Sequence, residues 1–148
     1  MSFKGDPQPP PPPSVFGQQA WTPAAESISI HPATRATVRG EQRVLDVRVR
    51  LIDALGDYTK ASGQWRFELH AVEGRQTEGN YTLLGLWNDK VLSLPEHRMH
   101  FDAATRSYRF QLPVEQALPS KPLRLLAVFT AEGNNYRIAD ELDIQMEK

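Results

Sequence analysis

From Glu26 onward, apolar and polar residues alternate with a period of two through much of the chain. The segments 44–53 (VLDVRVRLID), 64–71 (QWRFELHA) and 107–112 (SYRFQL) carry apolar side chains at every second position. Because successive side chains of a strand point to opposite faces of a sheet, this alternation predicts β-strands with one buried face.

Two further segments extend the pattern towards the C-terminus. Residues 123–130 (LRLLAVFT) are apolar on both sides except for Arg124, which predicts a strand in the middle of a sheet. Residues 136–146 (YRIADELDIQM) alternate again, and Asp140 interrupts their apolar side. A bulge or a strand end is therefore expected at Asp140.

Weaker strand patterns occur at 26–30 and 82–87, and turn-forming residues separate the segments. No segment keeps a helical period for three turns, and residues 114–118 have room for a single helical turn only. About seven or eight short strands with turn signals between them predict an all-β fold, an antiparallel β-sandwich.

The first 25 residues differ in composition from the rest. Six of the 12 prolines lie at positions 7 and 9–13. Proline has a fixed φ and no N–H, so this run favours an extended polyproline II conformation. We expect a disordered proline-rich tether over residues 1–25 and a β-sandwich domain over residues 26–148. The alternative role of the tether is as a ligand for a domain with an aromatic groove.

Composition and charge exclude several classes of protein. The 17 Lys and Arg residues and 18 Asp and Glu residues are mixed along the chain, which argues against a nucleic-acid binder. Without cysteine there are no disulfides, thiolate nucleophiles or cysteine-type metal sites. No apolar run has the length of a membrane span, and the first 25 residues lack the pattern of a signal peptide.

The stretch DALGD, residues 53–57, has two interpretations. Asp53 and Asp57 are candidate ligands of a weak calcium site, which needs about six to eight oxygen ligands. Further carboxylates from residues 140–143 would complete it only if the last strand ends at the same edge. The alternative is a turn, because Asp at a strand exit bonds the backbone ahead of it and Gly56 supplies a positive φ. The sequence favours the turn, since the Asp-rich loop of an EF-hand is absent.

Residues 96–102 (EHRMHFD) contain the one cluster in which histidines and carboxylates are neighbours. His97, His100, Glu96 and Asp102 are the candidate zinc ligands. Positions three apart point to opposite faces of an extended segment and meet only in a turn. Solvated loop histidines are therefore the favoured interpretation.

Motifs for catalysis and phosphate binding are missing: the chain has no G-x-S-x-G, no Walker A run and no G-x-G-x-x-G. Among the aromatic residues, Trp65 is expected in the core and Trp21 is a candidate anchor that docks the tether on the domain. Trp87 and Tyr81 are candidates for a sugar- or partner-binding surface, with packing at the sandwich edge as the favoured alternative.

The segment 45–69 (LDVRVRLIDALGDYTKASGQWRFEL) resembles the strand–turn–strand pattern of bacterial immunoglobulin-like domains. Through ISIHPATRA, the Trp87 region, FDAATRSYRFQLP and LRLLAVFTAEGNNYRIADELDI, residues 26–146 resemble small uncharacterised bacterial envelope proteins of a lipoprotein-like family. The resemblance implies one sandwich tethered to a membrane by a proline-rich segment, and it implies no activity and no binding residues. The chain departs from that family in lacking a signal peptide and a lipid-accepting cysteine.

Taken together, these features predict an immunoglobulin-like or C2-like sandwich that acts as a non-enzymatic, envelope-associated structural or protein-interaction module. The alternative is a sandwich that binds carbohydrate or Ca²⁺. No catalytic, cofactor-binding or metal-binding residue is assigned, and no cofactor is expected. The expected partner is a protein or another envelope component, and neither nucleic acid nor a transmembrane segment is expected. The expected location is the cell envelope or the extracellular space, with the cytoplasm as the alternative.

Overall fold

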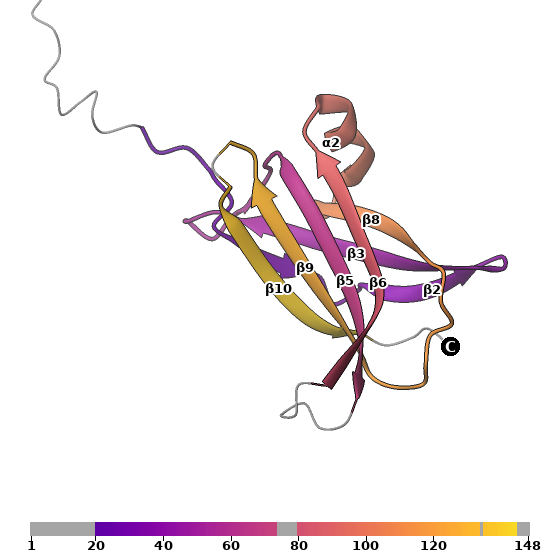
Figure 1. The fold of residues 1–148 in the computed structure, drawn as a ribbon. Helices are drawn as coiled ribbons and strands as arrows, with labels where there is room; N and C mark the ends of the chain where they lie inside the picture. Colours follow the sequence, from indigo (N-terminus) through magenta and orange to yellow (C-terminus); the bar gives the residue numbers. More distant parts are fainter. Residues whose placement is uncertain (1–19, 74–79, 134, 145–148) are drawn as a thin grey trace, which may run out of the picture.

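The computed structural model describes residues 20–73, 80–133 and 135–144, which fold into two antiparallel sheets packed face to face (Figure 1). These residues form ten strands and one short helix. In chain order the elements are β1 (Ser27–Ile30), β2 (Arg35–Arg39), β3 (Gln42–Ile52), β4 (Tyr58–Thr59), β5 (Gly63–Glu73), β6 (Asn80–Val91), α2 (Leu94–His100), β7 (Phe101–Asp102), β8 (Ser107–Val114), β9 (Leu123–Ala131) and β10 (Arg137–Ile144).

The strand order confirms the predicted all-β sandwich. Sheet A has the order β1-β3-β8-β7, and β2 and β4 also pair with β3. Sheet B has the order β10-β9-β5-β6, which places β9 inside a sheet as predicted. The expectation of seven or eight strands is too low for the described residues, because β4 and β7 have two residues each and show no period. Residues 115–118, where a helical turn had room to form, are irregular.

An aromatic cluster fills the space between the sheets and contains Trp65, which is 1% exposed. Its ring centroid lies 4.8 Å from that of Phe129 in sheet B. It also lies 5.4 Å from Phe110 and 5.5 Å from Tyr108 in sheet A. Aromatic pairs at these separations add to the gain from burying large apolar surfaces. The cluster therefore joins the two layers, and the prediction that Trp65 belongs to the core is confirmed.

Asp140 neither bulges nor ends its strand, so that expectation is wrong. The pairing of β10 with β9 runs without interruption from Arg137 to Ile144. The carboxylate Oδ2 of Asp140 instead accepts a hydrogen bond of 2.9 Å from the backbone N–H of Ile30 in β1. A polar side chain is tolerated on this side of β10 because it has a backbone partner in the other sheet.

Most of the predicted tether, residues 1–25, lies outside the described residues. Within the described part, Ala25 is buried in the core, whereas Trp21 is 53% exposed and is not among the residues packed against the core. In the part of the chain that the structure describes, no helix combines the length and the apolar character needed to cross a membrane.

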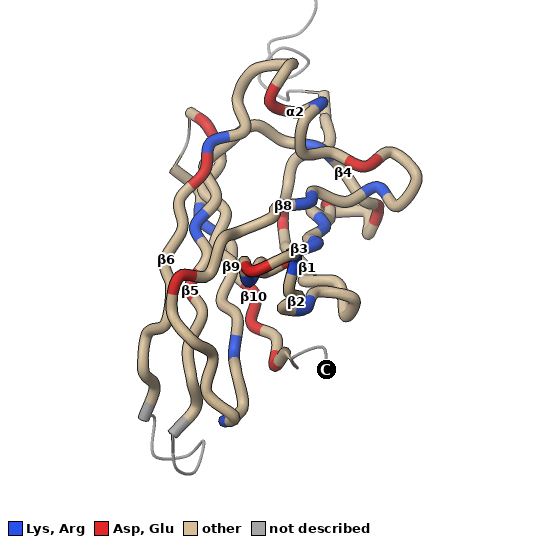
Figure 2. The backbone as a smooth tube through the Cα atoms, turned by 90° about the vertical axis from the view of Figure 1, so that its right-hand side faces the viewer, with Lys and Arg blue, Asp and Glu red and all other residues tan. Residues whose placement is uncertain are grey.

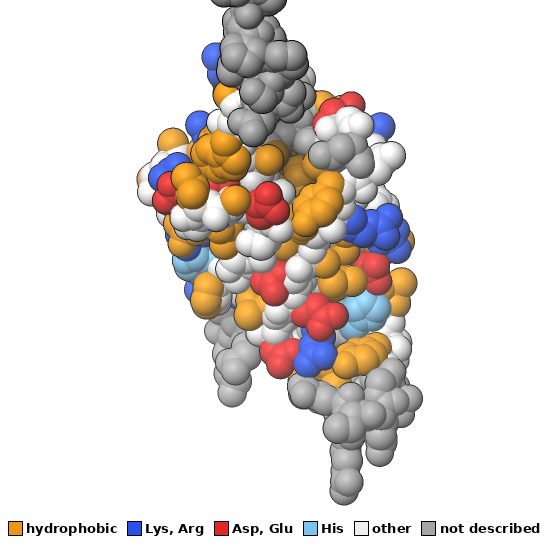
Figure 3. Space-filling model, turned by 90° about the vertical axis from the view of Figure 1, so that its left-hand side faces the viewer, with side chains coloured by type: hydrophobic (Ala, Val, Ile, Leu, Met, Phe, Trp, Pro, Cys, Tyr) orange, Lys and Arg blue, Asp and Glu red, His pale blue; other side chains and the backbone are white. Residues whose placement is uncertain are grey.

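Charged residues are interspersed over both sheets (Figure 2). On sheet A, Arg109 donates two hydrogen bonds to the carboxylate of Asp46, at 3.2 and 3.1 Å. On sheet B, Nε of Arg124 donates to Asp143 at 2.9 Å. Figure 3 shows the side of the molecule on which β10 lies, where acidic and apolar side chains are mixed. Ion pairs thus lie on the outer faces of both sheets.

Candidate functional site

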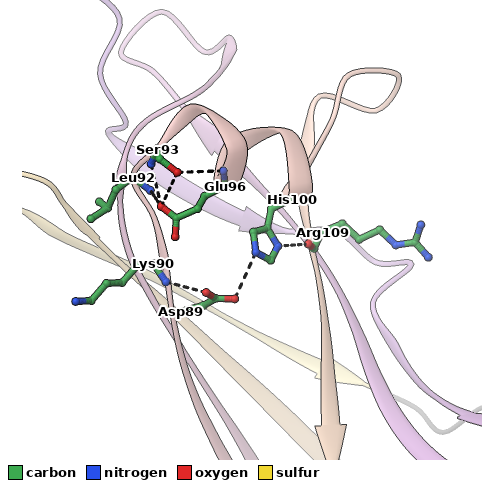
Figure 4. Close-up of polar contacts among 7 residues, drawn as sticks. All are labelled: Asp89, Lys90, Leu92, Ser93, Glu96, His100 and Arg109. Carbon is green, nitrogen blue, oxygen red and sulfur yellow. Dashed lines mark hydrogen bonds and ion pairs between the residues drawn. The ribbon is translucent and has the colours of Figure 1, made fainter.

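Helix α2 covers one end of the sandwich, next to the end of β6 (Figure 1). It begins with a capping box: Ser93 accepts a hydrogen bond from the backbone N–H of Glu96, and the Glu96 carboxylate accepts one from the N–H of Ser93 (Figure 4). This reciprocal pair satisfies backbone donors that a helix start leaves without intrahelical partners. Pro95 lies in the first turn, where its missing N–H costs nothing. These local signals explain why seven residues without an apolar stripe form a helix.

No residue of α2 is buried. The helix is attached to the sheets by the polar contacts of two histidines one turn apart, His97 and His100. Nδ1 of His100 lies 3.0 Å from the backbone carbonyl oxygen of Arg109, and Nε2 lies 3.5 Å from the Asp89 carboxylate (Figure 4). The His100 ring also stacks on Phe110, with centroids 4.5 Å apart. The favoured interpretation of these histidines as solvated loop residues is therefore wrong.

The second histidine, His97, joins three elements through a chain of hydrogen bonds. Its Nε2 lies 2.9 Å from Oγ of Ser62, and its Nδ1 lies 3.0 Å from the hydroxyl of Tyr108. Backbone carbonyls lie at both ends of the chain: Oγ of Ser62 is 3.3 Å from the carbonyl oxygen of Leu92, and the Tyr108 hydroxyl is 3.4 Å from that of Ala61. The Ser62–His97–Tyr108 chain thus connects the segment before β5 with α2 and β8.

Burial sets the protonation of this chain. It lowers the pKa of His97, an effect that the Glu96 carboxylate opposes and the Lys60 ammonium reinforces. Burial also raises the pKa of Tyr108 to about 12, although the backbone hydrogen bond from Ala61 opposes this shift. Both side chains are therefore neutral at neutral pH. A neutral imidazole has one donor and one acceptor nitrogen. Depending on the tautomer of His97, the hydrogen bonds therefore all point from Ser62 towards Tyr108 or all point the other way. In both cases a backbone carbonyl accepts the last hydrogen bond.

A pocket of about 600 Å³ opens beside the Ser62–His97–Tyr108 chain. Gly63 of β5 pairs with Val91 of β6, so the residues before β5 and those after β6 lie side by side and form its two walls. The pocket is lined by the polar and charged residues Lys60, Ser62, His97 and Arg98 and the apolar residues Ala61, Leu94, Phe101 and Ala103. We call this the α2 pocket.

At the DALGD stretch, the structure shows a turn. Oδ1 of Asp53 accepts hydrogen bonds from the N–H groups of Leu55 and Asp57, at 2.9 and 3.0 Å. Gly56 has φ 85°, the positive value that the turn requires. Asp140 bonds Ile30 at one end of β1, whereas Asp53 follows Ile52, which pairs with Ser27 at the other end. The carboxylates proposed for a shared calcium site are therefore apart.

The proposed zinc ligands also separate. The Glu96 carboxylate caps α2, and Asp102 accepts hydrogen bonds from Ala104 and Thr105 in the following turn. His97 and His100 bond different partners, as described above. Across residues 20–73, 80–133 and 135–144, no three His, Asp or Glu side chains are grouped so that they could hold a metal ion.

The aromatic candidates for sugar binding are part of the framework. Trp87 is half-buried against the core, and its indole N–H donates to the carbonyl of Pro113 at 2.9 Å. Tyr81 is 40% exposed, and its hydroxyl accepts a hydrogen bond from Arg124. Both lie on β6, whose pairing with β5 contains a register shift between Leu69 and His70. Trp87 therefore packs at the sandwich edge, which was the favoured alternative, whereas the Tyr81 ring is only partly covered.

Of the residues that line the α2 pocket, the sequence singled out His97, as a candidate zinc ligand, and none of the others. Ser62 and His97 are 35 positions apart, and only the register of β5 on β6 brings them together. The capping-box pair Ser93 and Glu96 was the one local signal for the helix that carries His97. A scan against models of protein families, a search of curated proteins and a search of solved structures each found no match for this chain. Its function is therefore inferred from the pocket.

Proposed function

We propose that this protein is a non-enzymatic binding module and that the α2 pocket is its ligand site. The observation that carries the proposal is the pocket itself. Its volume of about 600 Å³ lies within the range of about 300–1,000 Å³ that is typical of small-molecule sites. Its lining also has the usual composition of such sites, with apolar walls and a few polar groups that orient the ligand.

The Ser62–His97 contact invites comparison with a hydrolase, but the rest of the chain supports a structural role. In a serine hydrolase a carboxylate orients the imidazole and stabilises its positive form. Here that position is taken by the Tyr108 phenol, which is neutral at neutral pH. Ser62 also has the Leu92 carbonyl as an acceptor. The chain holds α2 against the sheets and so keeps the pocket open.

A pocket-filling variant tests the proposal. We suggest ligand-observed NMR on the full chain with a mixture of small neutral, anionic and cationic organic compounds. Ala103→Trp fills the α2 pocket, whereas Ala104→Trp adds the same bulk at the exposed neighbouring position outside the lining. We expect compounds that bind the wild type and Ala104→Trp to lose binding in Ala103→Trp. If no compound binds the wild type, or if the two variants behave alike, the proposal is wrong.

The immunoglobulin-like assignment is also a proposal, and the topology supports it. The order β1-β3-β8-β7 corresponds to strands A-B-E-D of that fold, and β10-β9-β5-β6 corresponds to G-F-C-C′. Trp65, buried on β5, occupies the strand on which immunoglobulin domains carry their core tryptophan. Many domains of this architecture act by binding, which is an argument from fold alone.

The location in the cell envelope rests on the resemblance and the proline-rich N-terminal segment. It is tested by the intact mass of the native protein after membrane and soluble fractions are separated. A membrane-bound form that carries a lipid would support the envelope proposal. A soluble form that starts at Met1, or lacks only that methionine, would exclude it and make the proline-rich segment the bait in a search for an intracellular partner.

A further inference from the structure

We propose that the α2 pocket selects a small amphipathic monocarboxylate, an organic acid with one carboxylate and an aliphatic or aromatic body. This inference rests on the proposed function, because it names the ligand class of the same pocket. Three features carry it: the charge of the lining, the nature of the walls and the polar groups at the floor.

The charge of the lining is positive. Lys60 and Arg98 approach the pocket from its two walls, and no Asp or Glu is among the described residues that line it. The nearest carboxylates in sequence have other partners, since Glu96 caps α2 and Asp102 accepts two hydrogen bonds in its own turn. An anion entering the pocket thus meets two cations and no lining carboxylate.

The walls favour an apolar body on that anion. Leu94 is 60% exposed, so a ligand that covers it removes apolar surface from water. Phe101 presents its ring to Lys60, whose Nζ lies 4.8 Å from the ring centroid. This cation–π contact holds the ammonium at the apolar wall, where a carboxylate can reach it while the body of the ligand packs on the ring.

The polar floor favours one negative charge rather than two. His97 is neutral at neutral pH, and its ring nitrogens bond Ser62 and Tyr108. Lys60 and Arg98 are therefore the charges available to the ligand, and both have exposed side chains that can follow a small head group. A neighbouring pocket of about 530 Å³ shares Lys60 and Ser62 but has Glu26 and Glu132 in its lining. A second negative charge on the ligand, placed in this neighbouring pocket, would be repelled by the carboxylates of Glu26 and Glu132.

The test compares three ligands with the same ten-carbon chain: decanoate, decanol and decyltrimethylammonium. The two ions are kept below their micelle-forming concentrations and decanol below its solubility limit. Binding to the full chain is measured by calorimetry or ligand-observed NMR. We expect decanoate to bind about tenfold more tightly than decanol, as two partly exposed charge contacts would give, and the cation to bind most weakly. The double variant Lys60→Met/Arg98→Gln should reduce the preference for decanoate to about one, because it removes both charges while keeping long side chains.

Lys90→Met is the matched control, since Lys90 is an exposed lysine of β6 outside the lining. It should leave the preference unchanged. Equal binding of decanoate and decanol, or a preference that survives in the double variant, would overturn the monocarboxylate and leave the binding proposal standing. If none of the three ligands binds, the monocarboxylate proposal is wrong. If the compound mixture described above also gives no binding, the proposed function fails with it.

Discussion

The carboxylate of Asp140 in β10 accepts a hydrogen bond of 2.9 Å from the backbone N–H of Ile30 in β1. These strands are the outer strands of different sheets, so the bond joins sheet A to sheet B along one side of the sandwich. Ile30 is 4% exposed, and a buried backbone donor needs a partner within the protein. Asp140, which breaks the apolar alternation of its strand, thus links the two sheets at the edge of the sandwich.

Removing this carboxylate should destabilise the protein. We expect Asp140→Ala to lower the free energy of unfolding by about 1–3 kcal/mol, because it leaves the N–H of Ile30 without its acceptor. Urea denaturation measures the loss. Asp143→Ala is the control, since the side chain of Asp143 is 60% exposed and pairs with Arg124 at the surface. Its effect should stay below about 1 kcal/mol, and equal effects of the two variants would contradict the role of Asp140.

Asp53 offers a second stability test, which also addresses calcium. Its Oδ1 holds the N–H groups of Leu55 and Asp57, and the residue is 7% exposed. We expect Asp53→Ala to cost about 1–3 kcal/mol. Asp53→Asn should cost less, because an amide oxygen still accepts hydrogen bonds. Millimolar Ca²⁺ should leave the melting temperature of the wild type unchanged. A rise that Asp53→Asn abolishes would show that the turn binds the cation after all.

The strands were predictable where burial repeats at every second residue. In β3, Leu45, Val47, Val49 and Leu51 are fully buried and the residues between them are half-buried, as the alternation indicates. The turn at residues 53–57 was also predictable from the sequence, because Asp and Gly have local backbone preferences that favour a turn. Such features depend on residues that are neighbours in the sequence, so the order of residues along the chain is enough to predict them.

The α2 pocket was not predictable in the same way. Helix α2 has seven residues and no buried side chain, so it leaves no periodic signal in the sequence. Ser62 and His97 meet only because Gly63 pairs with Val91, and that register depends on the whole sheet. The helix start at Ser93 was the exception, since a capping box is a local motif.

That capping box can be tested directly. Ser93→Ala removes the acceptor for the N–H of Glu96, and we expect α2 to lose about 1 kcal/mol of local stability. Because the helix has no buried residue, the loss should show as faster amide hydrogen exchange within α2, by about fivefold, more than as a lower melting temperature. Ser93→Thr should retain most of the protection. Equal exchange rates in wild type and Ser93→Ala would show that the cap does not hold the helix.

Gly63 is required by the close approach of β5 to β9. A Cβ at this position would lie 2.4 Å from the carbonyl oxygen of Thr130 and 2.6 Å from Cζ of Phe129. The first of these is backbone, so the two strands must move apart, and we expect Gly63→Ala to cost about 1–3 kcal/mol. It should also weaken ligand binding, because Ser62 follows the displaced strand. Thermal unfolding that matches the wild type would show that the strands adjust without cost.

The last prediction concerns pH. Burial lowers the pKa of His97 below its ordinary value of 6.5, so the folded protein resists protonation that the unfolded chain accepts. Where the unfolded state binds more protons, stability rises with pH. The contribution of His97 is therefore fully present above pH 6.5 and is lost as pH falls through 6.5 towards the lower folded value. Unfolding curves measured between pH 7.5 and 5 should show the decline.

His31 must be separated from His97, because burial, reinforced by Arg50 and Arg48, lowers its pKa in the same direction. We expect His97→Gln and His31→Gln each to flatten part of the decline, with additive effects in the double variant. The lowered pKa values of Glu68 and Asp102 act in a lower range, since the ordinary values of these carboxyls are about 4. A pH dependence identical in wild type and His97→Gln would mean that His97 is as hydrated in the folded protein as in the unfolded chain, and that the Ser62–His97–Tyr108 chain is open to water.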